Sequence, residues 1–325
     1  MHSHSSFSDE LARIVGPERV IAGASLAPLT TFKVGGPAEW LVTVESAAEV
    51  RDVVRAASAA ATPVTVLGGG SNVLVADSGV RGVVMRIRGG GVHAVDASHV
   101  RAGAGVTING LVRWTIGRGF KGIEAWAGTP GTVGGAIRGN AHFRGRLISE
   151  LIAQVELISP AGDLVMVKSS EMEFGYDRSR VQRTGEIVIS ADFHVGPGEP
   201  GALRAIARES LAFRKGTQPL ESASAGCIFQ NPDPSVDSVP AGIPASAGAL
   251  VDRAGLKGAR EGGAIVSPTH ANFIVNEGRA TAREIRALIA RCRDAVRDRF
   301  GVTLQEEVVY LGDWQGTRQN GDPAY

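Results

Sequence analysis

Hydrophobic and polar positions between residues 46 and 104 follow first a helical and then an extended pattern. Ser46 and Glu49 have the spacing of a capping box, and the apolar residues after them recur on one face, which predicts an amphipathic helix over Ser46–Ala61. Pro63 would end this helix. Short apolar, β-branched runs then predict strands at Val64–Leu67, Val83–Ile87 and Val100–Ala104.

The next hundred residues repeat this alternation of helix and strand. Thr107 can cap a second helix, whose apolar stripe runs to Ile116 and which Gly119 would end. The loop-rich stretch 128–145 contains so much glycine that we expect it to lie outside the core. Further strands are predicted at 154–159, 164–168 and 187–195, the first two joined by a hairpin turn at Pro160–Asp163. This half of the chain is therefore predicted to be α+β.

A glycine- and proline-rich run, Gly196–Gly201, marks a change of composition and a predicted domain boundary. Beyond it, 202–213 has a helical pattern, and the clearest element is a helix over Thr281–Phe300 with a Thr281/Glu284 capping box. A closing strand follows it, to Tyr310. The predicted divisions are an N-terminal extension (1–25), a first domain (26–198), a second domain (199–312) and a disordered tail (313–325).

Composition restricts the class of partner. The 325 residues are 43% hydrophobic and 21% charged, as in ordinary globular proteins. The formal net charge is +1, and because Lys and Arg are spread along the chain, we expect no binding to nucleic acid or to an anionic membrane. No run approaches the roughly 20 apolar residues that span a bilayer. We predict a cytoplasmic monomer that binds small molecules.

Cysteine and histidine give little sign of a metal centre. Cys227 and Cys292 lack the paired spacing of a disulfide framework or a metal site, which suits a reducing compartment. Cys292 falls on the apolar stripe of the last helix and is predicted to serve packing. We expect several histidines to be exposed and without a role, namely His2, His4, His93, His99 and His142.

Two glycine-rich loops, Leu67–Leu74 and Ala127–Ala136, carry candidate chemistry. Successive glycines leave backbone N–H groups open, and a turn of such groups binds anions, with hydroxyl donors available from Ser71 and Thr132. A diphosphate is the expected ligand. The dinucleotide fingerprint is not matched because Val73 stands where its last glycine belongs, and the chain has no GxxxxGK[ST] motif. Either loop alone could equally be a turn between strands.

Several motifs, taken together and in order, resemble those of the UDP-N-acetylenolpyruvoylglucosamine reductases over nearly all of 29–312. They are Thr31–Ala38, Leu67–Leu74, Gly103–Gly105, Gly128–Gly135, Ser224–Pro232, Ala254–Gly258, Gly262–Ala264, His270–Asn276 and Leu304–Val308. The resemblance implies an α+β fold with an FAD-binding domain of the vanillyl-alcohol-oxidase (PCMH) type, made of two α+β subdomains, and a C-terminal α+β substrate-binding domain.

The activity implied by the resemblance is reduction of UDP-N-acetylglucosamine enolpyruvate to UDP-N-acetylmuramate in peptidoglycan precursor synthesis. NADPH would reduce non-covalently bound FAD, and the reduced flavin would pass hydride to the enolpyruvyl double bond. The resemblance assigns the cofactor to Lys33, Gly35, Leu67, Gly68, Gly69, Gly70, Ser71, Asn72, Gly103, Gly105, Gly128, Thr129, Pro130, Gly131, Thr132, Gly134, Gly135 and Asn140.

Two catalytic residues follow from the same resemblance. Cys227 stands where the family has the Ser or Cys that acts as general acid, and a thiol with an ordinary pKa of about 8.5 holds its proton at neutral pH. Without the motif, Cys227 would be read as a small buried hydrophobe. Glu307 matches the family's carboxylate, although adjacent Glu306 leaves the register open and a solvated strand-end acid is the alternative.

The chain departs from the family where an arginine would stabilise the enolate. The usual order is Tyr-Arg-x-Ser, but this chain reads Tyr176-Asp177-Arg178-Ser179-Arg180, so either Arg178 or Arg180 would take the role, and we predict Arg178. The run Asn140–Gly145 also departs, because His142 and Phe143 replace a Gly-Ala pair of the family's pattern.

The remaining implied residues bind substrate, and they are Tyr176, Arg214, Lys215, Asn231, His270 and Asn272. Arg214 and Lys215 correspond to the family's diphosphate-binding basic residues, although a solvated helix end is the ordinary reading. Two other functions stay open: a flavin oxidase of the same superfamily acting on a sugar or alcohol, and a catalytically silent nucleotide-binding homologue. Together Cys227, Asn231 and Glu307 argue against the oxidase.

Overall fold

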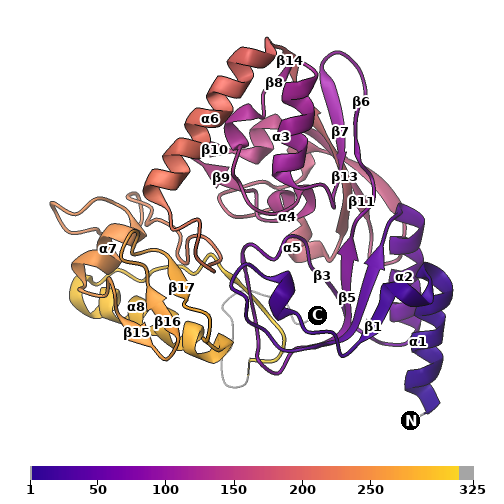
Figure 1. Ribbon diagram of the computed structural model, residues 1–325, viewed down its shortest axis with the longest axis horizontal. Coiled ribbons are helices and arrows are strands. Elements are labelled where there is room, and N and C mark those ends of the chain that lie inside the picture. Colours follow the sequence, from indigo (N-terminus) through magenta and orange to yellow (C-terminus); the bar gives the residue numbers. More distant parts are fainter. Residues whose placement is uncertain (1, 315–325) are drawn as a thin grey trace.

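The computed structural model describes residues 2–314, which form three lobes in succession along the chain (Figure 1). Each lobe has its own cluster of buried apolar side chains. Of the tail predicted to be disordered, Asp313 and Trp314 are described, and the Trp314 indole donates to Leu311 O at 3.1 Å; the rest lies outside the described residues. None of the described helices is long and apolar enough to cross a membrane.

The first lobe is built on a four-stranded sheet with the order β1-β2-β5-β3, in which β2 and β3 run parallel to β5. Its elements are α1 (His2–Val15), η1 (Pro17–Arg19), β1 (Val20–Ala22), η2 (Ala27–Leu29), β2 (Ala38–Val44), α2 (Ala47–Ala59), β3 (Val64–Val66), β4 (Val73–Val75) and β5 (Val80–Ile87). Helix α1 buries Phe7, Leu11 and Val15 in the same cluster as α2, so much of the segment 1–25 belongs to this lobe's core.

Helix α2 confirms the first predicted helix. Ser46 is its N-cap, and its hydroxyl accepts from the Glu49 N–H at 3.2 Å. The Glu49 carboxylate accepts from Glu45 N at 2.7 Å and from both terminal nitrogens of Arg19, at 2.9 and 2.8 Å. Only the Ser46 half of the predicted capping box therefore forms, because Arg19 and Glu45 engage the carboxylate.

The second lobe is built on a five-stranded antiparallel sheet with the order β12-β11-β13-β7-β6. Its strands are β6 (Val92–Ala94), β7 (His99–Gly103), β8 (Phe120–Lys121), β9 (His142–Phe143), β10 (Arg146–Leu147), β11 (Ile152–Ile158), β12 (Leu164–Lys168), β13 (Ile187–His194) and β14 (Gly196–Pro197). Its helices are α3 (Ile108–Gly117), η3 (Glu124–Trp126), α4 (Val133–Arg138), η4 (Ile148–Leu151), η5 (Ser169–Glu171), α5 (Val181–Thr184) and α6 (Pro200–Thr217). The predicted second helix and the β11–β12 hairpin are both confirmed.

The expectation that 128–145 lies outside the core is wrong. Helix α4 forms within it and buries Val133, Ala136 and Ile137 in the cluster of the second lobe. Asn140 is also fully buried. Its side-chain amide is satisfied there, because it donates to Gly175 O at 2.8 Å and accepts from Ser149 N at 3.1 Å. Gly134, in the first turn of α4, packs against Ala104, so glycine in this stretch does not keep the helix out of the core.

Helix α6 follows the predicted domain boundary but packs on the lobe before it. Leu203 and Ala207 join the buried cluster of the second lobe, and the Ser210 hydroxyl donates to Ala125 O at 2.5 Å. In Figure 1, α6 lies alongside α3 and only its C-terminal end points toward the third lobe. In packing, the change of core therefore comes after Thr217 and not at residue 199.

The third lobe contains α7 (Ala247–Arg253), β15 (Arg260–Glu261), β16 (Ala264–Val266), β17 (Ile274–Asn276), α8 (Ala282–Phe300) and β18 (Val309–Leu311). Helix α8 confirms the predicted last helix, including its full Thr281/Glu284 capping box and Gly301, at φ 71°, as its C-cap. Cys292 is buried on its apolar stripe, as predicted.

The chain returns from the third lobe to the first through its last strand. Strand β18 pairs in parallel with β4, and the Asn72 side chain donates to Glu307 O at 3.1 Å. Asp77 accepts from Ala282 N and Arg283 N at 2.9 and 3.0 Å, which satisfies the first N–H groups of α8. These contacts bring residues near 72 and near 307 together.

Candidate active site

The two glycine-rich loops lie against each other through their backbones. A Cβ added to Gly69 would stand 2.6 Å from Gly131 Cα, and one added to Gly68 would stand 2.7 Å from the Thr132 hydroxyl. Gly131 has a φ of +99°, and a Cβ added to it would stand 2.7 Å from the Ser71 hydroxyl. These positions need glycine because any side chain would force the two loops apart. We call the paired loops 67–72 and 128–135 the glycine cradle.

Other predicted cofactor residues border the glycine cradle. Gly105 packs against Ile87 O and Gly103 against Gly90, each too closely to admit a Cβ. The Thr31 N–H and hydroxyl contact Gly70 O at 3.0 and 3.3 Å, which brings the segment of Lys33 and Gly35 beside the loop. The Lys33 ammonium is exposed and donates to Pro28 O at 3.4 Å. Asn140, by contrast, is occupied in holding Gly175 and Ser149.

An asparagine that the sequence analysis missed fixes the second loop of the cradle. The Asn109 side chain accepts from Gly128 N at 2.7 Å and donates to Thr129 O at 3.3 Å. The Thr129 hydroxyl in turn accepts from Arg214 Nη2 at 2.7 Å. Arg214 is buried, lies 3.6 Å above the Phe143 ring centre, and keeps a buried Nε with no partner among the described residues. This Nε is a buried donor that the described residues leave without a hydrogen bond.

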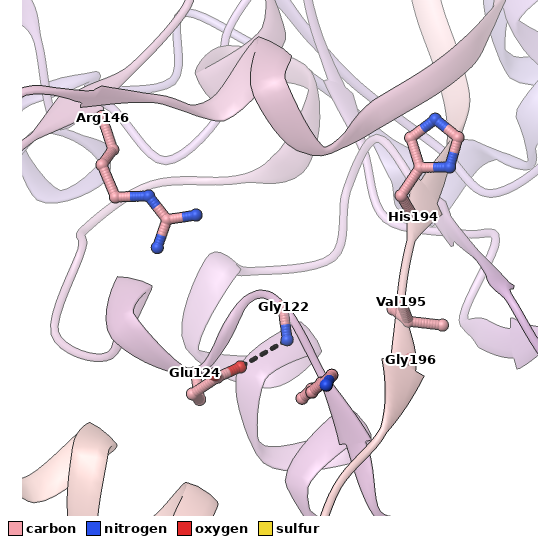
Figure 2. Close-up of a pocket in the computed structure, with 7 residues that line it drawn as sticks. Gly122, Glu124, Arg146, His194, Val195 and Gly196 are labelled. Atoms are coloured by element: carbon pink, nitrogen blue, oxygen red, sulfur yellow. Dashed lines mark hydrogen bonds between the residues drawn. The ribbon is translucent and has the colours of Figure 1, made fainter.

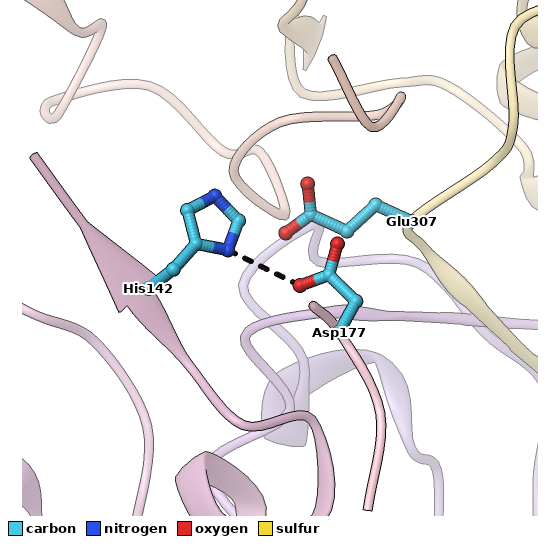
Figure 3. Close-up of side chains that lie close together, drawn as sticks. All are labelled: His142, Asp177 and Glu307. Atoms are coloured by element: carbon cyan, nitrogen blue, oxygen red, sulfur yellow. Dashed lines mark hydrogen bonds and ion pairs between the residues drawn. The ribbon is translucent and has the colours of Figure 1, made fainter. Parts of the chain in front are cut away.

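Beside the cradle, three side chains from distant segments converge (Figure 3). His142 lies on β9, Asp177 in the turn Gly175–Arg178, and Glu307 just before β18, and their nearest nitrogen and oxygen atoms all lie within 4.8 Å of one another. His142 Nδ1 lies 3.2 Å from Asp177 Oδ1. We call these residues the carboxylate–histidine cluster.

A strained turn directs Asp177 into this cluster. Gly175 and Arg178 exchange backbone hydrogen bonds of 3.0 and 3.2 Å, and Asp177 adopts a left-handed φ of 50°. Asn140 anchors the turn through Gly175 O. Asp177 Oδ2 is buried without a partner among the described residues, so one carboxylate oxygen remains available.

Cys227 belongs to a loop that two other segments clamp. The Asn272 side chain accepts from Phe229 N at 2.9 Å and donates to Phe229 O at 2.8 Å, while Ile228 O accepts from Glu307 N at 2.8 Å. Both functional groups of the Asn272 amide are thus engaged by the loop. Next along the strand, Glu306 binds Arg293 and Tyr310 at 2.6 and 2.7 Å, which leaves Glu307 as the carboxylate that faces His142 and Asp177.

Burial sets the protonation states of these groups. Burial, followed by the charge of Asp177, raises the pKa of Glu307 to about 8, and burial raises the pKa of the Cys227 thiol to about 12. The hydrogen bond to Asp177 raises the pKa of His142, with a further contribution from Glu307. Burial lowers the pKa of Arg214 to about 10. At neutral pH the site therefore holds a neutral Glu307, a protonated thiol and a positively charged Arg214.

The other predicted site residues lie outside the carboxylate–histidine cluster. Tyr176 is 44% exposed and its hydroxyl lies 3.2 Å from His142 Nε2. Arg180 forms a bidentate pair with Glu186, both bonds at 2.8 Å, whereas Arg178 is exposed, with its guanidinium beside Gly175. Lys215 is also exposed. Asn231 Oδ1 accepts from Ala247 N at 3.1 Å, and His270 Nδ1 accepts from Asn272 N at 3.2 Å.

The expectation that His142 is exposed is wrong. Its side chain is only 25% exposed, because it is enclosed by Asp177 and Tyr176. The signal that could have found it was the departure of two motifs from the family pattern, at 142 and at 177. These positions are far apart in the sequence, so only the fold shows that they meet.

One cavity lies apart from this site (Figure 2). It has a volume of about 370 Å³ and is lined by Lys121, Gly122, Glu124, Arg146, His194, Val195 and Gly196. Glu124 Oε2 accepts from Gly122 N there. All seven residues belong to the second lobe, and none is a predicted site residue, so the cavity is not part of the candidate active site.

Comparisons with known proteins give the family of the chain. Residues 38–168 match the model of an FAD binding domain, and residues 218–311 match the C-terminal domain of UDP-N-acetylenolpyruvoylglucosamine reductase. UDP-N-acetylenolpyruvoylglucosamine reductase 2 of Symbiobacterium thermophilum is 38% identical over 310 residues, which cover 95% of this chain and 97% of that protein. The chain belongs to the UDP-N-acetylenolpyruvoylglucosamine reductase family.

Further members of this reductase family extend the match. The Heliobacterium modesticaldum reductase is 38% identical over 90% of each chain. The crystal structure of the reductase from Thermus caldophilus superposes with a TM-score of 0.72 at 34% identity, covering 90% of this chain and 98% of that one. The predicted α+β fold with an FAD-binding domain and a C-terminal domain is confirmed, and the chain is an FAD-binding oxidoreductase of this family.

Proposed function

We propose that the protein reduces UDP-N-acetylglucosamine enolpyruvate to UDP-N-acetylmuramate, using non-covalently bound FAD and NADPH as the reductant. The observation that carries the proposal is the contact between the glycine cradle and the main chain of the proposed catalytic acid: Asn72 of the cradle donates to Glu307 O at 3.1 Å. A ligand in the cradle and a substrate beside Glu307 would therefore lie close together. The names of the family's members supply the substrate.

The residues present fit FAD. Among the described residues, the N–H groups of 68–71 donate to no protein acceptor, which suits binding of a diphosphate. Arg214 adds a buried, unpartnered Nε at the edge of the cradle. Residues 68–72 and 128–135 would hold the cofactor, and bound FAD would supply the hydride that the double bond receives.

This chain supplies the proton. Reduction of the enolpyruvyl group adds a hydride to one carbon and a proton to its neighbour, and Cys227 holds a proton on Sγ across the neutral pH range. Loss of that proton leaves a thiolate, which neutral Glu307 can reprotonate. The clamp of Asn272 on Phe229 keeps Cys227 in place during this exchange.

The substrate's other groups have candidate partners around the same opening. Tyr176, Asn231 and His270 border the cluster and the Cys227 loop, and we assign them to the sugar and enolpyruvyl groups. Lys215, exposed at the end of α6, and Arg214 are assigned to the substrate diphosphate, although the contact of Arg214 with Thr129 places it nearer the cradle. We place the enzyme in the cytoplasm, which suits two free cysteines.

Anaerobic absorption spectroscopy of the FAD-loaded protein tests the proposal. We expect NADPH to bleach the flavin bands, and the enolpyruvyl UDP-sugar alone to restore them with formation of UDP-N-acetylmuramate. A colourless protein that cannot be reconstituted with FAD would support the silent homologue. A protein that binds flavin but is indifferent to the UDP-sugar would contradict the proposed substrate and leave the oxidase standing.

A further inference from the structure

His142 is held between an acid and a phenol. Its Nδ1 lies 3.2 Å from Asp177 Oδ1, its Nε2 lies 3.2 Å from the Tyr176 hydroxyl, and the two rings stack with centres 4.6 Å apart. The carboxylate at Nδ1 fixes the ring orientation, and Nε2 is held by the Tyr176 hydroxyl. Because Tyr176 is 44% exposed, a substrate group can reach this nitrogen by displacing that hydroxyl.

The charges around the imidazole favour its cationic form. Asp177 and Glu307 face it from two segments and raise its pKa, while burial and Arg214 act in the opposite direction. Two further titratable groups, Tyr176 and Cys227, lie beside the cluster, and because burial raises the pKa of each, both are neutral at neutral pH. His142 is therefore the group that can place a positive charge directly beside Asp177 and Glu307.

Two departures from the family's sequence pattern meet at this pair. Asp177 stands where an arginine is expected, and His142 stands where a glycine is expected. The first change alone would replace a cation by an anion beside Glu307, which disfavours binding of a substrate carboxylate there. The second change returns a cation to the same position, 3.2 Å from the acid.

The nearby arginines fit the role less well. Arg180 is committed to Glu186 through two hydrogen bonds of 2.8 Å. Arg178, which the sequence analysis favoured, lies exposed against Gly175 on the turn. The carbonyl and N–H of Arg178 close the turn that directs Asp177, so the main chain of Arg178 helps to position Asp177.

We propose that the His142 imidazolium, positioned by Asp177, is the cation that binds the carboxylate of the enolpyruvyl group and stabilises the negative charge that develops on it. This inference rests on the proposed function and specifies one residue of its substrate site. Asp177 is a positioning residue in this scheme, since it acts through the imidazole.

Stopped-flow measurement of the two half-reactions tests the proposal in the FAD-loaded enzyme. We expect His142→Gln to slow reoxidation of the flavin by the enolpyruvyl UDP-sugar by about 10²–10³-fold. Reduction by NADPH should stay within about twofold of wild type, because no developing substrate charge is involved. His99→Gln is the matched control, since His99 also binds an aspartate, Asp96, at 3.1 Å but lies outside the site.

A second test of the role of His142 moves the positive charge from position 142 to position 177. His142→Gly and Asp177→Arg should each impair reoxidation, and the double variant, which restores the family's pattern, should recover to within about tenfold of wild type. Histidine NMR of the unliganded protein adds a readout independent of turnover. The His142 signal should titrate above the ordinary value of about 6.5 and shift down in Asp177→Asn.

Three results would overturn the inference alone: wild-type reoxidation in His142→Gln, a double variant no faster than the single variants, or a His142 signal that Asp177→Asn does not shift. Loss of activity with EDTA that Mn²⁺ or Zn²⁺ restores would also overturn it, by assigning the cluster to a metal. If the wild-type flavin is reduced by NADPH but never reoxidised by the UDP-sugar, the proposed function and the inference fall together.

Discussion

The glycine cradle and the carboxylate–histidine cluster are neighbours that are specified in opposite ways. The cradle is formed by an absence of side chains, where Gly69 and Gly131 bring two backbones within a distance that no Cβ allows. The cluster is formed by side chains alone, delivered from β9, a turn near 177 and the segment before β18. A substitution in the cradle is therefore restricted by the space for a side chain, whereas a substitution in the cluster is restricted by the charge it adds or removes.

A shared device fixes both regions. Asn109 binds the backbone of Gly128 and Thr129 in the cradle. Asn272 binds both backbone groups of Phe229 in the Cys227 loop, which joins the cluster where Ile228 O accepts from Glu307 N. The two clamps differ in burial and in what they position. The comparison therefore predicts that cofactor binding and substrate chemistry can be impaired separately.

The largest effect is expected at Cys227. Cys227→Ala removes the proposed proton donor, and we expect reoxidation of the flavin by the UDP-sugar to slow by about 10²–10⁴-fold while FAD stays bound. Cys227→Ser should retain part of the rate. Stopped-flow absorbance measures both, with Cys292→Ala as the control for a buried thiol outside the site. A wild-type rate in Cys227→Ala would remove Cys227 from the mechanism.

The cradle is tested by adding one methyl group. Gly69→Ala places a Cβ 2.6 Å from Gly131 Cα, and at an overpacking cost of about 1–3 kcal/mol the affinity for FAD should fall about 10–100-fold. Flavin fluorescence titration measures the affinity. Gly117→Ala is the matched control, because a Cβ there meets nothing within 4 Å. Equal FAD affinity in the two variants would contradict the role of the cradle.

The paired asparagines sharpen the comparison. Asn272→Ala leaves a buried N–H and C=O of Phe229 unsatisfied, at about 1–3 kcal/mol, and should lower turnover more than FAD affinity. Asn109→Ala should show the opposite bias, lowering FAD affinity more than the rate of substrate-dependent reoxidation. Titration and single-turnover kinetics on both variants check this. A similar loss of both properties in each variant would show that the regions are not separable.

The pH dependence of stability tests the environment of Glu307. Its folded-state pKa of about 8 lies above the ordinary value of 4.5, so between these values the folded protein keeps a proton that the unfolded chain has lost. Unfolding then releases a proton, and stability falls as pH rises through this window, by at most about 1.4 kcal/mol per pH unit.

The variant Glu307→Gln should remove this dependence and gain stability relative to wild type at pH 8. Thermal unfolding at pH 5 and pH 8 measures the difference. Glu306→Gln is the adjacent control, because Glu306 is paired with Arg293 and Tyr310. If wild type and Glu307→Gln lose stability in parallel as the pH rises, Glu307 is not the buried acid described.

The sequence predicts the cradle better than the cluster. Helices α2, α3 and α8 were found from caps and apolar spacing, and the cradle loops from their glycines, since each signal is local. The burial of α4 was missed, because glycine content hid the apolar positions Val133 and Ile137. Local patterns describe an element but not the core in which it packs.

The cluster depends on contacts that no local pattern contains. Glu307 could be chosen over Glu306 only by the family's motif, and the structure then shows Glu306 bound to Arg293. His142 was dismissed as an exposed histidine, although Asp177 is its partner 35 residues later. Such a pair is recognised only after the fold brings both positions together.

A crystal structure of the protein with FAD and the enolpyruvyl UDP-sugar tests the whole comparison most directly. We predict the FAD diphosphate against residues 68–72 and 128–132, and the substrate carboxylate within hydrogen-bonding distance of His142 Nε2, with Cys227 beside the carbon that receives the proton. FAD bound away from the cradle, or a substrate carboxylate held by Arg178 with His142 turned aside, would contradict the account.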